Sequence, residues 1–240
     1  MPLFRLLLPG RAAVAWPADV GAGLYRRPSR PGDPEVFALA LPDRPEPWIA
    51  ALEPRASPAR RERAARFRDP MDALRCLAAE ALFRQSAKEL HDLDPPQLAT
   101  TAGPQGKPCL LDHPGLQFNL SHAGRWVLCA WDDRPVGVDV EVARPLRPGL
   151  AQAVLAPEEW HSHQTLPEGQ RAAAFFRLWT LKESLLKAAG IGLRQDPRSL
   201  RIGCDHQPGS GAPPAPSGCA WHLLPLPLPA GAWAALCFAR

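Results

Sequence analysis

Two acidic residues stand two positions apart in the otherwise apolar segment VGVDVE, at Asp139 and Glu141. If this segment is a β-strand, both side chains project from one face, while Val138 and Val140 face the core. Carboxylates about 4 Å apart repel each other by about 4 kcal/mol at an effective dielectric constant near 20. A divalent cation would reverse the sign of this interaction, and the polar side of an edge strand is the plainer alternative.

A third carboxylate belongs to the segment FFRLWTLKESLLKAAG, which mixes aromatic and leucine side chains with charged ones. On a helix, Trp179, Glu183 and Lys187 form one stripe because they are spaced four residues apart. Trp179 and the leucines predict a helix seated on the core, and Lys187 is expected to contribute little to folding. An ordinary Glu–Lys helix pair, contributing about 0.2–0.5 kcal/mol, is one explanation of the charges.

A shared metal ion is the other explanation, because it would account for Asp139, Glu141 and Glu183 together. Carboxylate oxygens completed by water and phosphate oxygens suit Mg²⁺, or Mn²⁺ in its place. Lys187, one turn after Glu183, would then meet the phosphates.

Two further polar segments follow predicted strands or turns. Ser121 and His122 end the strand FNLSH beside a Gly-containing turn, where they could hold a phosphate or serve as polar turn residues. Lys107 lies in the glycine-rich segment GPQGKP, which lacks the spacing and the following Ser or Thr of a phosphate-binding loop. A plain surface loop is therefore the alternative for Lys107.

An arginine-rich helix is predicted from SPARRERAARF, because Ser57 is a good N-cap and Pro58 suits the first helical position. Arg60 and Arg63 lie one turn apart, either on a solvated face or as an anion site. The net charge of +4 favours an anionic partner without distinguishing nucleic acid, nucleotide and acidic protein.

The elements that must position these side chains form two groups of helices and strands. Helical segments are expected near 57–67, 71–90, 148–160 and 169–190. Strands are expected near 1–10, 116–122, 126–131, 136–141, 198–203, 220–226 and 231–239. The break at 132–135 is the expected domain boundary, which gives two halves that each pack helices on an antiparallel sheet.

Composition and length exclude several classes of protein. The 46% of hydrophobic residues suffices for a core, and no apolar stretch approaches the roughly 20 residues of a membrane span. The apolar run at the start of the chain is too short for a signal peptide. The six cysteines lack the spacing of zinc ligands and are expected to be buried free thiols, which suits a cytoplasmic protein.

The order and spacing of SPARRERAARF, GKPCL, FNLSHAGRWV, GVDVE and WTLKESLLK resemble 4′-phosphopantetheinyl transferases of the surfactin-synthetase-activating class, over residues 57–190. The resemblance implies an α+β fold, a pseudo-dimer of two similar halves, 1–133 and 134–240, with the active site in the cleft between them. It also implies transfer of the 4′-phosphopantetheine arm of coenzyme A to a serine of an acyl or peptidyl carrier protein. Adenosine 3′,5′-bisphosphate would be released.

The same resemblance implies the catalytic roles. Asp139, Glu141 and Glu183 would be the Mg²⁺ ligands, and Lys187 would contact the diphosphate of coenzyme A. Glu183 would accept the proton of the carrier serine, directly or through water.

Coenzyme A would be bound by residues from several of the motifs. They are Arg60, Arg63 and His122 at the 3′-phosphate, Gly106, Lys107 and Pro108 at the adenine, and Ser121 and Lys187 at the diphosphate.

We therefore expect a cytoplasmic monomer with coenzyme A and carrier proteins as partners, and without nucleic acid or membrane partners. Three other hypotheses stay open. The positive charge would suit a basic nucleic-acid-binding module, and the acidic residues would suit a metal-dependent nucleotide phosphohydrolase. An inactive relative that only binds carrier domains is the third, although the intact set of acids argues against it.

Overall fold

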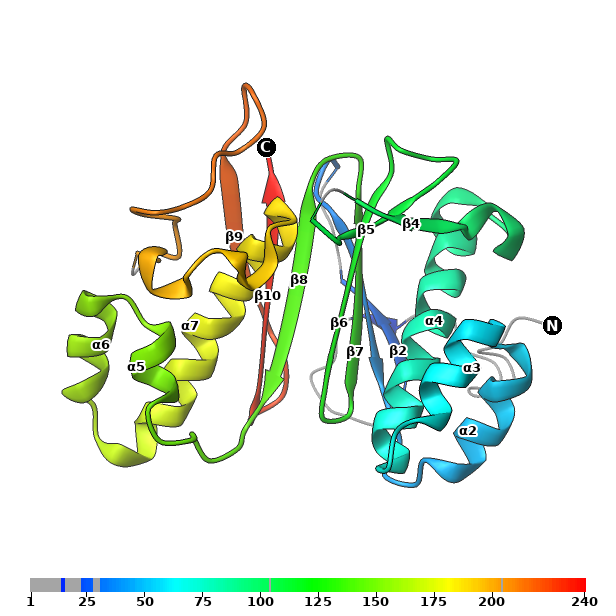
Figure 1. Cartoon of the computed structure of the whole chain (residues 1–240), viewed down its shortest axis with the longest axis horizontal. Coiled ribbons are helices and arrows are strands. Elements are labelled where there is room, and N and C mark those ends of the chain that lie inside the picture. The colour runs from blue at the N-terminus through cyan, green and yellow to red at the C-terminus, as the bar shows by residue number, and fades with distance from the viewer. Residues whose placement is uncertain (1–13, 16–22, 28–30, 104, 204) are drawn as a thin grey trace.

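Two β-sheets pack face to face at the centre of the molecule, and each is covered on its outer side by helices (Figure 1). The computed structural model describes residues 14–15, 23–27, 31–103, 105–203 and 205–240. Small and branched apolar side chains from both sheets, among them Ala38, Leu128, Val138 and Leu236, form one cluster between the sheets. The predicted combination of helices and antiparallel sheets is confirmed.

The first sheet has the strand order β1-β2-β3-β7-β6. Its neighbouring strands are antiparallel except for the pair β1 and β2. The strands are β1 (Val14–Ala15), β2 (Gly23–Arg26), β3 (Glu35–Ala40), β6 (Gln117–Ala123) and β7 (Trp126–Asp132). A separate two-stranded sheet is formed by β4 (Thr100–Ala102) and β5 (Pro108–Leu110).

Two of the helices on this sheet begin where the sequence predicts, whereas the helix at Glu46–Leu52 was not predicted. The Ser57 side chain caps α3 (Pro58–Ala65) by accepting a hydrogen bond from the Arg60 amide. The Asp69 side chain caps α4 (Pro70–His91) by accepting a hydrogen bond from the Met71 amide. The buried side of α4 covers the outer face of the sheet around Trp131. The remaining helical segments are α2 (Glu46–Leu52), η1 (Glu53–Arg55) and η2 (Pro95–Leu98).

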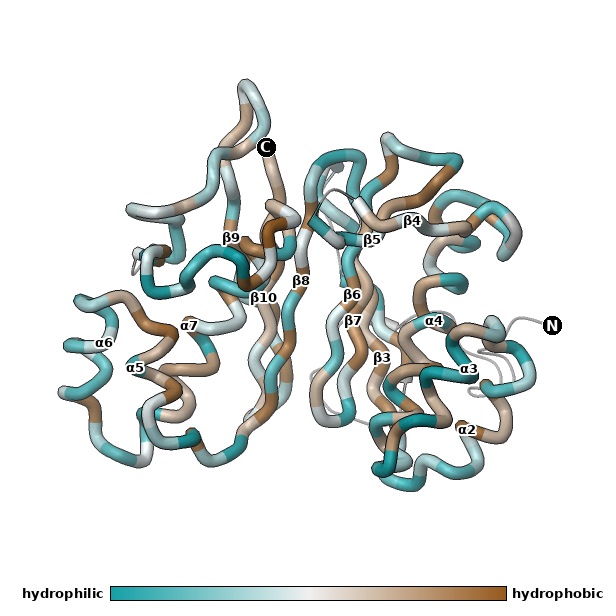
Figure 2. The backbone as a smooth tube through the Cα atoms, in the orientation of Figure 1, coloured by the Kyte–Doolittle hydropathy of each residue, from teal (hydrophilic) through white to brown (hydrophobic). Residues whose placement is uncertain are grey.

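The second sheet has the order β8-β10-β9 and is fully antiparallel. Its elements are β8 (Val136–Val142), β9 (Trp221–Leu226), β10 (Ala232–Ala239), α5 (Leu150–Val154), α6 (Pro157–Gln164), α7 (Glu168–Ala189), η3 (Gly192–Arg194) and η4 (Pro197–Ser199). The long helix α7 lies along the sheet, and α5 and α6 lie beyond it (Figure 1). Hydrophobic segments gather along the central strands, whereas much of the outer surface is hydrophilic (Figure 2).

Two element predictions need correction, and one lies outside the described residues. The expected helix over 148–160 is divided, because Pro157 begins a new helix after the extended residue Ala156. The strand expected near 198–203 is wrong: a 3-10 turn at 197–199 is capped by Asp196, and only Ile202 makes an isolated bridge, to Pro208. The strand expected at 1–10 falls on residues that the structure does not describe.

Gly137 allows β8 and α7 to pack backbone against backbone. A Cβ atom built at this position would lie 2.1 Å from the Ser184 carbonyl oxygen and 2.4 Å from the Ala188 nitrogen. Real side chains do not approach so closely, so an alanine would have to push the helix away from the strand.

We therefore expect Gly137→Ala to lower the free energy of unfolding by about 1–3 kcal/mol or more. Thermal melts check this. Gly169→Ala is the control, because a Cβ at Gly169, in α7, meets no atom within 4 Å. Equal melting temperatures for Gly137→Ala and the unaltered protein would contradict the close packing.

Candidate active site

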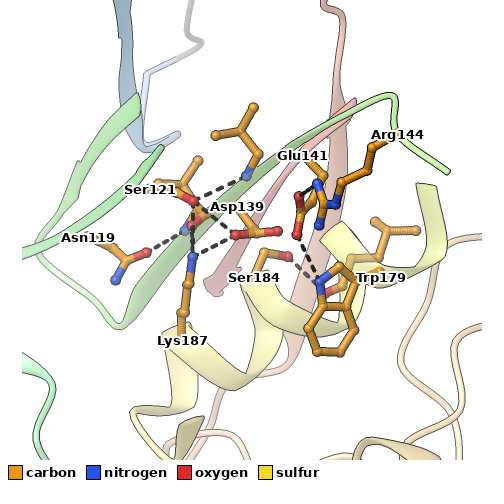
Figure 3. A network of polar contacts seen from close by, with 11 residues as sticks. Asn119, Ser121, Asp139, Glu141, Arg144, Trp179, Ser184 and Lys187 are labelled. Carbon is orange, nitrogen blue, oxygen red and sulfur yellow. Dashed lines mark hydrogen bonds and ion pairs between the residues drawn. The ribbon is translucent and has the colours of Figure 1, made fainter. Parts of the chain in front are cut away.

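Asp139, Ser121 and Lys187 meet where β6, β8 and α7 come together (Figure 3). The Lys187 ammonium donates to Asp139 Oδ1 at 2.6 Å and to Ser121 Oγ at 3.1 Å. Ser121 Oγ in turn donates to Asp139 Oδ1 at 2.9 Å and accepts the Val140 amide. Asp139 is only 5% exposed, so this ammonium compensates a buried carboxylate.

The edge strands β6 and β8 are held side by side through side chains of β6. Asn119 Oδ1 accepts the Val138 amide at 2.9 Å, and Ser121 Oγ accepts the Val140 amide at 3.3 Å. Val138 and Val140 are buried between the sheets, as the alternation in VGVDVE predicted. The polar residues of FNLSH therefore join the two sheets beside the site.

Glu141 is fixed by two donors. Its Oε1 accepts the indole N–H of Trp179 at 3.1 Å, and its Oε2 accepts from Arg144 at 2.6 Å (Figure 3). Trp179 is half-buried, so its expected place in the core is only partly right, and its N–H orients a candidate metal ligand. Arg144 also lies over the ring of Phe176, 4.6 Å from its centre.

Glu183 lies on α7, one turn from both Trp179 and Lys187. The pKa of Glu183 is raised to about 7, chiefly by burial; the charge of Lys187 opposes this rise, and the nearby Asp139 and Glu141 carboxylates add to it. Within the described part of the chain, the Glu183 carboxylate makes no hydrogen bond or ion pair. The Glu183–Lys187 ion pair, which was the alternative explanation of these charges, is not formed, because Lys187 turns to Asp139.

The donor chemistry of this site fits a divalent cation. Asp139 Oδ2 is buried without a hydrogen-bond partner, and the Glu183 carboxylate is unpaired among the described residues, so both carboxylates can accept a ligand. In their present rotamers, however, no three acidic, His or Cys side chains of the described residues are gathered as a metal site. Lys187 and Arg144 hold Asp139 and Glu141, and a metal would have to compete with both cations.

A second group of predicted residues lines a cavity of about 500 Å³ in the first half of the chain, namely Arg60, Arg63 and Pro108. Glu80 lies at the wall of this cavity and accepts from both the amide and the hydroxyl of Ser57. Because Glu80 thereby fixes the start of α3, it holds the arginines of that helix at the cavity. The same carboxylate lies 3.8 Å from the Arg60 guanidinium.

His122 lies near the end of β6, next in the sequence to Ser121. The protein atoms that partly shield its ring from water lower the pKa of His122, and the positive charges of Arg75, Lys187 and Arg63 lower it further. Arg75 donates to the Gly124 carbonyl oxygen at 2.6 Å. The surroundings of His122 are therefore cationic, as an anion site requires.

Lys107 and Lys182 both join separate elements of the fold, but their partners differ. The Lys107 amine turns toward the second half and donates to the carbonyl oxygens of Val136 and Ala188. Lys182, fully buried, pairs with Glu159 at 2.6 Å and also donates to two backbone carbonyl oxygens. Lys182 thus links α7 to α6. Gly106, which precedes Lys107, adopts a left-handed backbone conformation with φ +89°.

Family comparisons place the chain. The model described as the 4′-phosphopantetheinyl transferase superfamily matches residues 135–237, and that described as 4′-phosphopantetheinyl transferase, N-terminal, matches residues 44–133. The 4′-phosphopantetheinyl transferase Sfp of Bacillus subtilis (strain 168) is 34% identical over 165 residues, which cover 68% of this chain and 74% of that protein. The chain belongs to the 4′-phosphopantetheinyl transferase superfamily.

Other phosphopantetheinyl transferases are similarly related. The transferase psf-1 of Bacillus pumilus is 37% identical over 60% of this chain and 62% of its own length. HetI of Nostoc sp. is 35% identical over 66% of this chain and 70% of its own length. The predicted family is confirmed, and these matches support neither a nucleic-acid-binding module nor a phosphohydrolase.

Several residues that shape this transferase site escaped the sequence analysis: Gly137, Arg144, Glu80, Arg75 and the Glu159 partner of Lys182. One signal was visible, since a lysine within the apolar face of α7 implies a buried counter-charge. The partner could not be named, because Glu159 is distant in the sequence. The metal and coenzyme A roles of the predicted residues stay predictions.

Proposed function

We propose that this phosphopantetheinyl transferase moves the 4′-phosphopantetheine arm of coenzyme A onto a serine hydroxyl of an acyl or peptidyl carrier protein. The observation that carries the proposal is the arrangement of Asp139, Glu141 and Glu183 with Lys187, in a chain that also has a cavity lined by arginines. Coenzyme A carries negative charge at its diphosphate and at its 3′-phosphate. The arginines of the cavity match the 3′-phosphate. Lys187, together with a metal ion held by the three carboxylates, would match the diphosphate.

The binding roles follow from this match. Arg60, Arg63 and His122 hold the 3′-phosphate, since guanidinium groups bind phosphate through paired hydrogen bonds. Lys187 and Ser121 hold the diphosphate. The loop Gly106–Pro108 lies on the adenine side.

The reaction joins the serine oxygen to the phosphorus that bears the pantetheine arm. The bond between this phosphorus and the bridging oxygen breaks, and adenosine 3′,5′-bisphosphate leaves. Asp139, Glu141 and Glu183 would hold Mg²⁺, or Mn²⁺, which supplies a Lewis acid when bound. Glu183 takes the serine proton directly or through water. Lys187 stabilises the charge that develops on the leaving oxygen.

The proposed organisation is a pseudo-dimer of two α+β halves, 1–133 and 134–240, with the active site in the cleft between them. It is supported by the contribution of Ser121 from β6 and of Asp139 and Lys187 from β8 and α7. We further propose a monomer in the cytoplasm. No helix of the described residues is long and apolar enough to cross a membrane.

Mass spectrometry of apo carrier proteins tests the function. Incubation with the transferase, coenzyme A and Mg²⁺ is expected to add one phosphopantetheine to the carrier, and none when excess EDTA is present. Release of free phosphate or phosphopantetheine without any carrier would instead support a phosphohydrolase. Salt-dependent binding of random oligonucleotides, without transfer, would support the nucleic-acid hypothesis.

Arg60→Ala is expected to raise the Kd for coenzyme A about 10- to 100-fold, because hydrogen bonds to a charged group contribute about 1.5–3 kcal/mol. The Kd for dephospho-coenzyme A, which lacks the 3′-phosphate, should change by far less. Calorimetry with both ligands measures the difference. Arg61→Ala is the control, because Arg61 is exposed and does not line the cavity. Equal losses for both ligands would contradict the assignment of Arg60.

A further inference from the structure

Lys107 links the loop before β5 to both elements that carry the active site. Its ammonium donates to the Val136 carbonyl oxygen at 2.9 Å and to the Ala188 carbonyl oxygen at 3.1 Å. Val136 is the first residue of β8, and Ala188 lies in the last turn of α7. Three segments far apart in the sequence therefore converge on one side chain.

The bond to Ala188 satisfies one of the carbonyl groups at the end of α7. The last four carbonyl groups of a helix have no partner within the helix. The Gly190 and Ile191 amides satisfy the carbonyl groups of Leu186 and Lys187, and Lys107 satisfies that of Ala188. A positive charge at a helix C-terminus is also stabilised by the helix dipole.

The position of the Lys107 ammonium does not suit a solvent-facing phosphate ligand. The Lys107 stem lies against the helix end, since a Cβ at Gly190 would be 3.5 Å from Lys107 Cδ. Burial lowers the pKa of Lys107 to about 8. Within the described residues, no carboxylate pairs with this amine, so backbone carbonyl oxygens alone receive its hydrogens.

The same loop reaches the arginine-lined cavity through the next residue. Pro108 lines the cavity, and the loop is tightened by hydrogen bonds from Gly106 to the Gly103 carbonyl and from Gly103 to the Lys107 carbonyl. Asp139 lies three residues after Val136, and Lys187 directly precedes Ala188. Loss of the Lys107 amine would therefore change the positions of both Asp139 and Lys187.

We propose that Lys107 is a positioning residue, whose amine clamps the start of β8 and the end of α7 so that Asp139 and Lys187 are correctly placed. The amine does not bind a phosphate of coenzyme A. The catalytic consequence rests on the proposed function, whereas the clamp itself does not.

Lys107→Met tests the clamp, because methionine retains the apolar stem and removes the donors. Amide hydrogen exchange over residues 185–189 is expected to accelerate about tenfold or more, since the variant loses two charge-assisted hydrogen bonds at the helix end. The kcat for carrier modification is expected to fall about tenfold or more, as for other displaced catalytic groups. The Kd for coenzyme A should stay within about threefold, and its ratio to that for dephospho-coenzyme A should not change.

Lys88→Met is the matched control, because Lys88 is an exposed lysine on the surface of α4. It should leave both the exchange at 185–189 and the kcat unchanged. A large rise in the Kd for coenzyme A, with normal exchange at the end of α7, would overturn the proposal in favour of direct phosphate binding. If the unaltered protein modified no carrier, the proposed function would fail, while the exchange data would still decide the clamp.

Discussion

Glu183→Gln is expected to abolish carrier modification, with a loss of roughly 10²–10⁴-fold or more, typical of removing a general base. The substitution removes one of three carboxylates from the proposed Mg²⁺ site and, with it, the proton acceptor. The fold should persist, because the Glu183 carboxylate makes no hydrogen bond or ion pair within the described residues. Without metal, the variant should even melt no lower than the unaltered protein, since burial and two neighbouring carboxylates disfavour the charge of Glu183.

Three measurements check this result: carrier modification, melting temperature, and the rise in melting temperature on adding Mg²⁺. Ligands that bind only the folded state raise its stability, so the unaltered protein should respond to Mg²⁺ and Glu183→Gln should respond much less. Glu168→Gln, an exposed acid in the first turn of the same helix, is the matched control. Full activity in excess EDTA, or an undiminished Mg²⁺ response of Glu183→Gln, would rule out the metal role.

Local periodicity predicted much of the fold and the identity of the acidic residues. The alternation in VGVDVE placed Val138 and Val140 in the core, and the four-residue spacing placed Glu183 and Lys187 on one stripe of α7. These are properties of a single strand or helix, which sequence alone determines. The failed strand near 198–203 shows the limit, because the Asp196 cap with Pro197 favours a turn over a short apolar alternation.

Contacts between elements distant in the sequence were not predictable. The side-by-side arrangement of β6 and β8 decides that Ser121 meets Asp139, and no pattern within either strand encodes that register. The same holds for Trp179, whose indole N–H finds Glu141 on β8. Half-burial with a polar contact cannot be distinguished from full burial by helical periodicity.

Lys187 contributes more to the stability of the fold than the sequence predicted. Its ammonium lies 2.6 Å from Asp139 Oδ1, and Asp139 is only 5% exposed. Burial raises the pKa of Asp139, while the charge of Lys187 and hydrogen bonds from Lys187 and Ser121 oppose that rise. Removal of the ammonium would leave a buried carboxylate without its counter-charge, which typically costs about 3–5 kcal/mol.

We therefore expect Lys187→Ala to lose about 3–5 kcal/mol of stability without metal, and to lower kcat by about 10²-fold or more, as the loss of a preorganised electrostatic donor does. The two effects should separate when Mg²⁺ is added. A cation bound at Asp139 can replace the lost counter-charge, so the melting temperature should recover. The kcat, which is measured with Mg²⁺ present, should stay low, because the metal does not supply the second positive charge at the leaving oxygen. Melts with and without Mg²⁺, steady-state assays, and Lys88→Ala as an exposed-lysine control measure both effects. An unchanged melting temperature without metal would show that Asp139 is not held by Lys187, and a kcat equal to that of the unaltered protein would show that the ammonium serves the fold alone.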